Sequence, residues 1–218
     1  MRTSLLVLFG ATTLTFTKAQ LNFSLSTDSS VSVPLRLDSQ DSISALRFYI
    51  SNVRIEHERK IVWSAEQEHY LIDFNQDHLQ SNNISGQEGS DLKEGVLKFV
   101  LGVDDNTSAQ GIGEGPLDPI RGMYWTWQSG YINFKLEGVS NQCRTRKNKF
   151  QLHLGGFQKP YRTAQNIELK ISGEQKTVVF NLKKLMSTIN LKEDHTIMSP
   201  NEKAVFFMES AKSCFYVQ

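Results

Sequence analysis

Residues 131–137 read YINFKLE, a run in which apolar and polar side chains alternate. The alternation places Ile132, Phe134 and Leu136 on one face, as in a strand that is buried on one side only. Residues 95–103 read GVLKFVLGV, which is more uniformly apolar and is typical of a strand in the middle of a sheet. These two runs predict a protein built on β-sheet.

Eight further runs have the composition of short strands. They are residues 21–26, 31–37, 46–55, 60–63, 70–74, 150–154, 167–171 and 177–180. Helical spacing is scarce, and only residues 181–186 favour one or two helical turns. Two long polar stretches, residues 76–93 and 104–122, are expected to be functional or disordered loops. We therefore predict an all-β fold: a single antiparallel β-sandwich, Ig-like in style, with long loops and at most one or two short helices.

The first 19 residues have the pattern of a secretory signal peptide. Met1 and Arg2 precede the apolar run LLVLFGA, residues 5–11, and the segment ends at the small residue Ala19. The apolar run is much shorter than the ~20 residues that span a bilayer. A buried N-terminal strand is the alternative. We expect cleavage after Ala19, one mature domain over residues 20–218, and a periplasmic or secreted location.

Export would place the two cysteines, Cys143 and Cys214, in an oxidising compartment. A disulfide between them would close a loop of roughly 70 residues and stabilise the fold by a few kcal/mol. Two unpaired thiols are the alternative, because the sequence does not give the Cα separation on which a disulfide depends.

Composition and motifs exclude several classes of function. The 218 residues carry 24 Lys and Arg against 23 Asp and Glu, and this balance argues against nucleic acid or an anionic membrane as the main partner. The chain has no motif of a serine hydrolase, a helical zinc protease or a phosphate-binding loop. Residues 111–115 are rich in Gly, but Pro116 follows them and no helix is expected there. They are therefore not expected to form a nucleotide-binding loop, which needs a helix N-terminus at this point. We predict that the protein is not an enzyme.

The five histidines do not form a compact metal-binding motif. They are His57, His69, His78, His153 and His195, and no two of them stand at a short ligand spacing. A metal site would therefore be assembled from distant segments, with His69 and His153 as the candidates because both lie on expected strands. Asp73 lies on the same face as His69, but four strand residues span about 13 Å, so these two side chains cannot hold one ion.

The segment GMYWTWQSGY, residues 122–131, is the densest group of aromatic residues. Trp125 and Trp127 stand two positions apart and would share one face of a strand. They either fill the core or form a rigid aromatic wall beside a pocket or a metal.

Several spaced blocks of the chain resemble the MbnP-like proteins. The blocks are FVLGVD (99–104), GPLDP (115–119) and GMYWTWQSGYINFKLEG (122–138), with LRFYISNV (46–53), LID (71–73) and LHLGGF (152–157) in the same order. The family comprises exported copper-binding proteins related to the methanobactin-associated periplasmic protein and to surface copper proteins of methanotrophs. The resemblance implies an exported β-sandwich over nearly the whole mature chain, with a copper site built mainly by histidines from separate segments. In some members a Trp near the metal is oxidatively modified.

The resemblance also implies which residues of this chain serve the site. His153, in LHLG, matches a family histidine, and His69 lies one position before another, with Tyr70 in the expected place. Many relatives carry a His in the loop after GVD, where this chain reads DDNT, residues 104–107. Either an Asp substitutes for this His or the site is degraded. The expected ligands are thus His69 and His153, with Trp125, Trp127 and Asp105 surrounding them.

Copper is the expected ion, since imidazole suits Cu(II) and copper outcompetes other divalent first-row ions at nitrogen sites. The expected partners are this ion and a redox partner protein in the periplasm, with neither nucleic acid nor a transmembrane segment involved. Two alternatives remain open. One is a metal-free exported β-sandwich whose long loops bind a protein or a glycan, and the other is a substrate of a redox partner in which Trp oxidation is itself the function.

Overall fold

The computed structural model describes residues 20–26, 35–36, 41–74, 82–86, 94–127, 130–172 and 177–218. The expected signal peptide, residues 1–19, and most of the strand expected at residues 31–37 lie outside the described residues. The other nine predicted strands all overlap observed ones. In the described part of the chain, no helix is long and apolar enough to cross a membrane.

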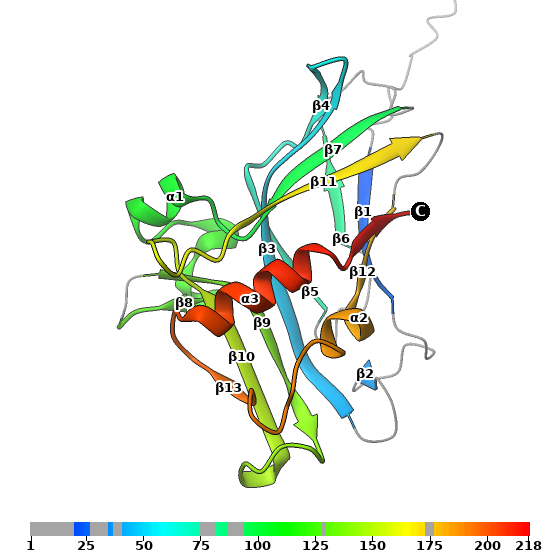
Figure 1. The fold of residues 1–218 in the computed structure, drawn as a ribbon. Coiled ribbons are helices and arrows are strands. Elements are labelled where there is room, and N and C mark those ends of the chain that lie inside the picture. Colours follow the sequence, from blue (N-terminus) through cyan, green and yellow to red (C-terminus); the bar gives the residue numbers. More distant parts are fainter. Residues whose placement is uncertain are drawn as a thin grey trace, which may run out of the picture.

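The strands form two sheets (Figure 1). The larger sheet has the order β11 (Gln165–Ser172), β7 (Glu94–Leu101), β3 (Asp41–His57), β9 (Gly130–Ser140), β10 (Lys149–Gly155) and β13 (Thr196–Ile197). Four short strands add to it, β2 (Leu35–Arg36), β4 (Lys60–Ser64) and β5 (His69–Asp73) on β3, and β8 (Tyr124–Trp125) on β9. The smaller sheet has the order β14 (Phe215–Val217), β12 (Thr177–Asn181), β1 (Gln20–Ser26) and β6 (Asn82–Ser85).

β3 runs through the centre of the larger sheet and changes its neighbour halfway. Residues 41–48 pair with β9, whereas residues 50–56 pair with β7. The register shifts between Ser51 and Arg54, and Asn52 inside this bulge has a φ of 55°, a left-handed conformation that Asn tolerates better than most residues. Along its other edge β3 pairs with β5 through residues 47–51 and with β4 through residues 54–57. The two halves of the strand therefore have different neighbours.

The all-β class is confirmed, but the strands are mixed rather than purely antiparallel. β1 pairs with β12 in parallel, and β10 pairs with β13 in parallel. These pairs join segments that are far apart in the sequence, which short-range alternation cannot reveal. The helix α2 (Leu182–Met186) lies where one or two turns were predicted.

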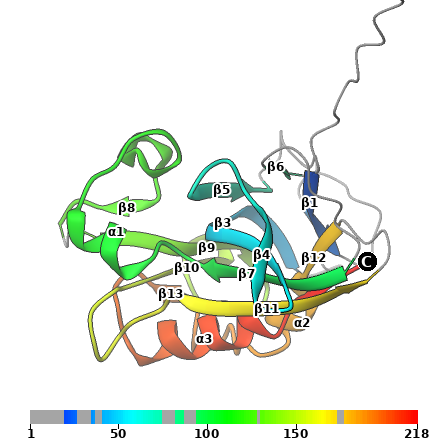
Figure 2. The same cartoon turned by 90° about the horizontal axis from the view of Figure 1, so that it is seen from above.

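A third α-helix, α3 (Glu202–Lys212), was not predicted from the sequence. Asn201 caps it by accepting a hydrogen bond from the Ala204 amide at 2.9 Å. Its buried residues have the spacing i, i+3, i+4 and i+7 of an amphipathic helix: Ala204, Phe207, Met208 and Ala211. Figure 2 shows α3 lying along β10 and β11, so it covers one face of the larger sheet.

The main core lies between the two sheets and α3 and is built around phenylalanines. Phe48 stacks on Phe134 at a centroid distance of 5.5 Å and meets Phe215 edge-on at 5.8 Å, while Phe180 lies 4.8 Å from Phe215. Aromatic pairs in these arrangements add to the free energy gained from burial alone. These rings join β3, β9, β12 and β14 into one core.

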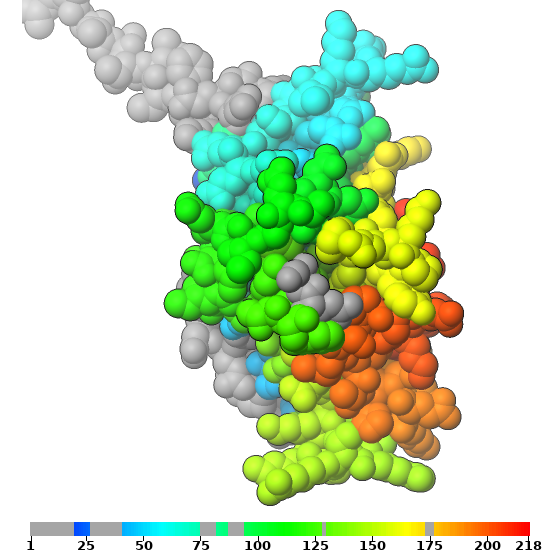
Figure 3. Space-filling view, turned by 90° about the vertical axis from the view of Figure 1, so that its left-hand side faces the viewer, coloured from blue at the N-terminus to red at the C-terminus, as the bar shows by residue number. Residues whose placement is uncertain are grey.

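The opposite face of the larger sheet is covered by residues 104–127, here called the covering segment. It contains α1 (Asp105–Gln110), the short 3-10 turns Gly115–Leu117 and Pro119–Arg121, and β8. Its side chains and those of the sheet form a second core: Tyr49, Val103, Leu117, Met123, Trp125, Tyr131 and Ile132. Figure 3 shows the covering segment in green, beside the cyan β3–β4 hairpin and the yellow residues after β10. The stretch expected to be a loop is thus an ordered layer of the molecule.

Candidate metal site

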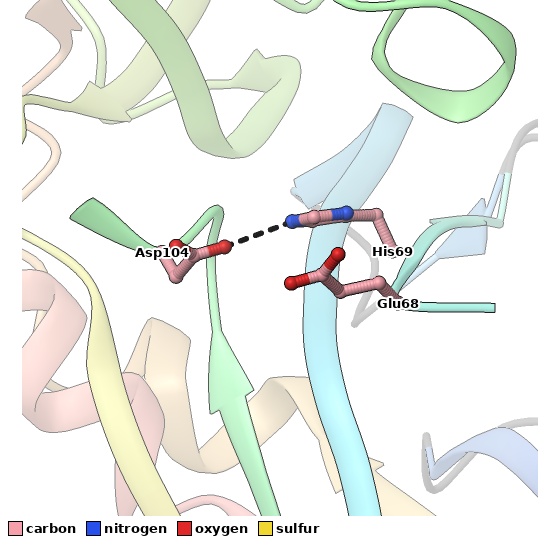
Figure 4. A group of neighbouring side chains, drawn as sticks. All are labelled: Glu68, His69 and Asp104. Atoms are coloured by element: carbon pink, nitrogen blue, oxygen red, sulfur yellow. Dashed lines mark hydrogen bonds and ion pairs between the residues drawn. The ribbon is translucent and has the colours of Figure 1, made fainter. Parts of the chain in front are cut away.

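His69 is the first residue of β5, and its ring reaches across to the end of β7. It pairs with Ser51 of β3 in the sheet, and its side chain is only 9% exposed. Its Nε2 lies 2.9 Å from Oδ2 of Asp104, three residues beyond the end of β7 (Figure 4). The sheet thus brings two segments that are 35 residues apart into direct contact.

Asp104 is held in place because it also caps α1. Its Oδ1 accepts hydrogen bonds from the amides of Asn106 and Thr107, both at 3.1 Å, and its Oδ2 accepts one from the Thr107 hydroxyl at 2.8 Å. Burial by itself would raise the pKa of Asp104, but the bonds from Thr107 and His69 outweigh it and hold the pKa below its usual value. The carboxylate is therefore ionised and fixed in orientation at neutral pH.

Glu68 adds a second carboxylate to this pair. One ligand atom from each of Glu68, His69 and Asp104 lies within 4.8 Å of the other two, and Figure 4 shows the Glu68 carboxylate beneath the ring of His69. Nitrogen and oxygen ligands bind transition metals at about 2.0–2.2 Å, so donors of one ion stand up to about 4.4 Å apart. A small closure would bring all three donors onto one ion. The Glu68 side chain is exposed, which leaves this side of the cluster open to solvent.

His153 lies elsewhere on the same face of the sheet. It stands on β10 opposite Lys135 of β9, and its Nε2 lies 2.6 Å from Oε1 of Glu137. The hydrogen bond from His153 lowers the pKa of Glu137 to about 2; burial opposes this shift, and Lys135, with its Nζ 3.6 Å away, adds to it. His153 Nδ1 is buried and has no hydrogen-bond partner among the described residues.

The sheet register separates the two expected ligands. His153 is three strands away from β5, along the row that runs through Lys135 and Arg47 to Asp73. Three strand spacings and four residues along β5 correspond to a separation of about 19 Å. His69 and His153 therefore cannot hold the same ion.

The three residues expected around the ligands lie in different surroundings. Trp125 is buried, whereas Trp127 is 64% exposed, and their ring centroids lie 5.8 Å apart. Asp105 forms an ion pair with Arg162, with its two oxygens 2.8 and 2.6 Å from Nε. The carboxylate that contacts His69 is that of the preceding residue, Asp104.

A known protein family and a solved structure are similar to this chain. The family model MbnP matches residues 10–199. This chain belongs to the MbnP family. Among solved structures, MbnP from Methylosinus trichosporium is similar with a TM-score of 0.63 and 14% identity over 88% of each chain. At this identity the likeness establishes the fold, and no curated protein matches the chain.

Sequence reasoning found one of the three clustered residues in this MbnP-family chain. His69 was predicted as a ligand and Asp105 of the DDNT loop was predicted to lie near the ligands, whereas the carboxylate that contacts His69 is that of Asp104. The available signal was the helix cap: Asp104 stands three residues before Thr107, whose amide and hydroxyl it accepts. Glu68 gave no signal, because an exposed Glu in a polar turn is common.

Of the two alternatives for the cysteines, a disulfide or two unpaired thiols, the structure has the unpaired thiols. Cys143 and Cys214 are both free and buried. Cys143 follows β9, whereas Cys214 follows α3, where its Sγ lies 3.4 Å from the Ser210 carbonyl oxygen. Burial raises the pKa of both thiols, which keeps them protonated and unreactive.

Proposed function

We propose that this protein is an exported metal-binding protein that holds Cu(II) at Glu68, His69 and Asp104. The observation that carries the proposal is the cluster itself, in which one imidazole and two carboxylates have their donor atoms within 4.8 Å of one another. With a neutral imidazole the three side chains carry two negative charges, and among the described residues no Lys or Arg forms an ion pair with them. A divalent cation would balance this charge.

The donor set fits Cu(II) better than Cu(I). Imidazole nitrogen and carboxylate oxygen suit Cu(II), whereas Cu(I) prefers the sulfur of Cys and Met, and the cluster contains neither. At a nitrogen and oxygen site Cu(II) also binds more tightly than Zn(II) or the earlier divalent ions. Bound Cu(II) would supply a one-electron redox centre. The residues of the chain would bind and orient it, with Thr107 and the α1 amides holding Asp104 in place.

Family membership supports copper and export. The match to the MbnP family model agrees with the copper site that the resemblance implies, and the first 19 residues of this chain have the pattern of a secretory signal. We therefore place the protein in the periplasm or outside the cell. A redox protein of that compartment is the partner that fits a copper carrier.

Titration of the purified chain with Cu(II), followed by the visible d–d band, tests the proposal. We expect one saturating equivalent, at least 100-fold weaker binding in His69→Ala, and about 10-fold weaker binding in Glu68→Gln. His153→Ala is the matched control, because it removes an equally buried histidine from the same sheet face and is expected to leave the affinity unchanged. Parental affinity in His69→Ala would overturn the assignment.

A further inference from the structure

A second concave site lies at the end of β10, away from the carboxylate cluster. It is a hollow of about 280 Å³ whose walls include Trp125, Phe157, Tyr161 and Pro200. None of its lining residues belongs to the proposed metal site. The volume is at the lower end of the range for small-molecule sites, which suits a ligand with a single ring.

The hollow is held open by tight backbone packing. Gly156 has a φ of 127°, and a Cβ there would collide with the Tyr161 carbonyl oxygen and lie 3.0 Å from Pro200. Gly155 lets the indole of Trp125 lie against the strand, since a Cβ would approach the ring to 2.8 Å. Thr163 closes the loop by donating from its amide and its hydroxyl to the Gly156 carbonyl oxygen, at 2.9 and 3.0 Å. The walls are therefore preorganised, which lowers the cost of binding.

The polar groups of the hollow favour an anion. Lys159 is the only charged side chain among the described residues that line it, and no ion pair of Lys159 occurs in the described part of the chain. The Trp125 Nε1–H is buried and has no acceptor among the described residues. Leaving such a donor unpaired costs about 1–3 kcal/mol, and an acceptor on a ligand would offset this cost.

We propose that this hollow binds a small aromatic carboxylate. The aromatic walls would contact the faces and edges of its ring, and Lys159 would pair with its carboxylate. A sugar acid carries the same charge but also several hydroxyl groups that need acceptors. Among the described residues of the lining, only Gln158 and Tyr161 offer side-chain acceptors, which are too few for the hydroxyls of a sugar.

Benzoate titration followed by NMR tests the proposal, with the indole N–H resonance of Trp125 as the reporter and that of Trp63 as an internal reference. We expect saturable shifts at Trp125 with a Kd on the order of 1 mM. Benzamide, which has the same ring without the charge, should bind about 10-fold more weakly. Lys159→Gln should weaken benzoate about 10-fold, Phe157→Ala should weaken both ligands, and the exposed control Lys170→Gln on β11 should change neither.

Three outcomes would overturn the proposal. Equal affinities for benzoate and benzamide would remove the role of the charge, and parental benzoate affinity in Lys159→Gln would remove the role of this residue. Saturable binding of glucuronate without binding of benzoate would assign the hollow to a sugar acid. Because the titration contains no copper, its result is independent of the copper titration of the His69 variants.

Discussion

His69 and His153 are two versions of the same arrangement on one face of the larger sheet. Both are buried, at 9% and 6% exposure, and both place Nε2 on a carboxylate oxygen, at 2.9 and 2.6 Å. The carboxylate of Glu137 is balanced by Lys135, whereas Asp104 has a second carboxylate, Glu68, beside it. Burial and a His–carboxylate pair are common to both groups. The uncompensated negative charge at an open edge is what favours the group at His69 as the proposed metal site.

Replacing the enclosed histidine should have the largest effect on stability. His153→Ala removes the partner of Glu137 and leaves a cavity, so we expect a loss of about 3 kcal/mol in the free energy of unfolding. His69→Ala should cost about 1 kcal/mol without metal, because Asp104 keeps its bonds from Thr107 and Asn106. Urea unfolding of both variants measures the difference. A larger loss in His69→Ala would reverse the roles assigned to the two histidines.

Lowering the pH should reduce the free energy of unfolding through Glu137, the partner of His153. The loss should be somewhat smaller than that caused by His153→Ala. The folded-state pKa of Glu137, about 2, lies below the ordinary value of 4.5, so its contribution is complete above about pH 4.5 and is lost as the pH falls towards 2. We expect a loss of about 2 kcal/mol over this range, after allowing for the 24% exposure of the side chain. Unfolding of the parent and of Glu137→Gln at several pH values measures it. Identical pH slopes for the two proteins would contradict the prediction.

Substitutions of Asp104 should have the smallest effect on stability. They separate its role as the cap of α1 from its proposed role as a metal ligand. Asp104→Asn keeps a cap on α1, since Asn caps helices as well as Asp, and should leave stability nearly unchanged. Asp104→Ala loses the cap and should cost about 1 kcal/mol, measured by thermal unfolding. Both variants remove a negative charge from the proposed site and should weaken the binding of Cu(II). If Asn and Ala were equally destabilising, the cap would not be the source of the loss.

The fold could be predicted largely because its long strands carry their own pattern. The alternation in β9 and the apolar run of β7 are local features, and both strands were found. The parallel pairing of β1 with β12 depends on residues about 155 positions apart, which no local pattern encodes. α3 had a readable spacing in Ala204, Phe207, Met208 and Ala211, and it was missed because the rest of the chain has period two.

The site was harder to predict than the fold. His69 and Asp104 meet because β5 and β7 lie on opposite sides of β3 and both pair with its residues 50 and 51. A one-residue slip in the pairing of β5 with β3 would turn the side chain of His69 to the other face of the sheet, away from Asp104. The sequence therefore drew attention to His69 and to residues 104–107, and the structure shows that Asp104, and not Asp105, contacts His69.

The long central strand β3 also has a consequence for synthesis. Its partners extend to residue 140, so after His57 has been made about 80 further residues must follow before both edges of β3 can be paired. At about 5–20 residues per second, the edge of β3 that pairs with β7 and β9 stays incompletely paired for on the order of 10 s. An open apolar strand of this length is prone to aggregate, and charges within it oppose this. Arg47, Arg54 and Glu56, which form ion pairs in the finished sheet, would protect the nascent chain during that interval.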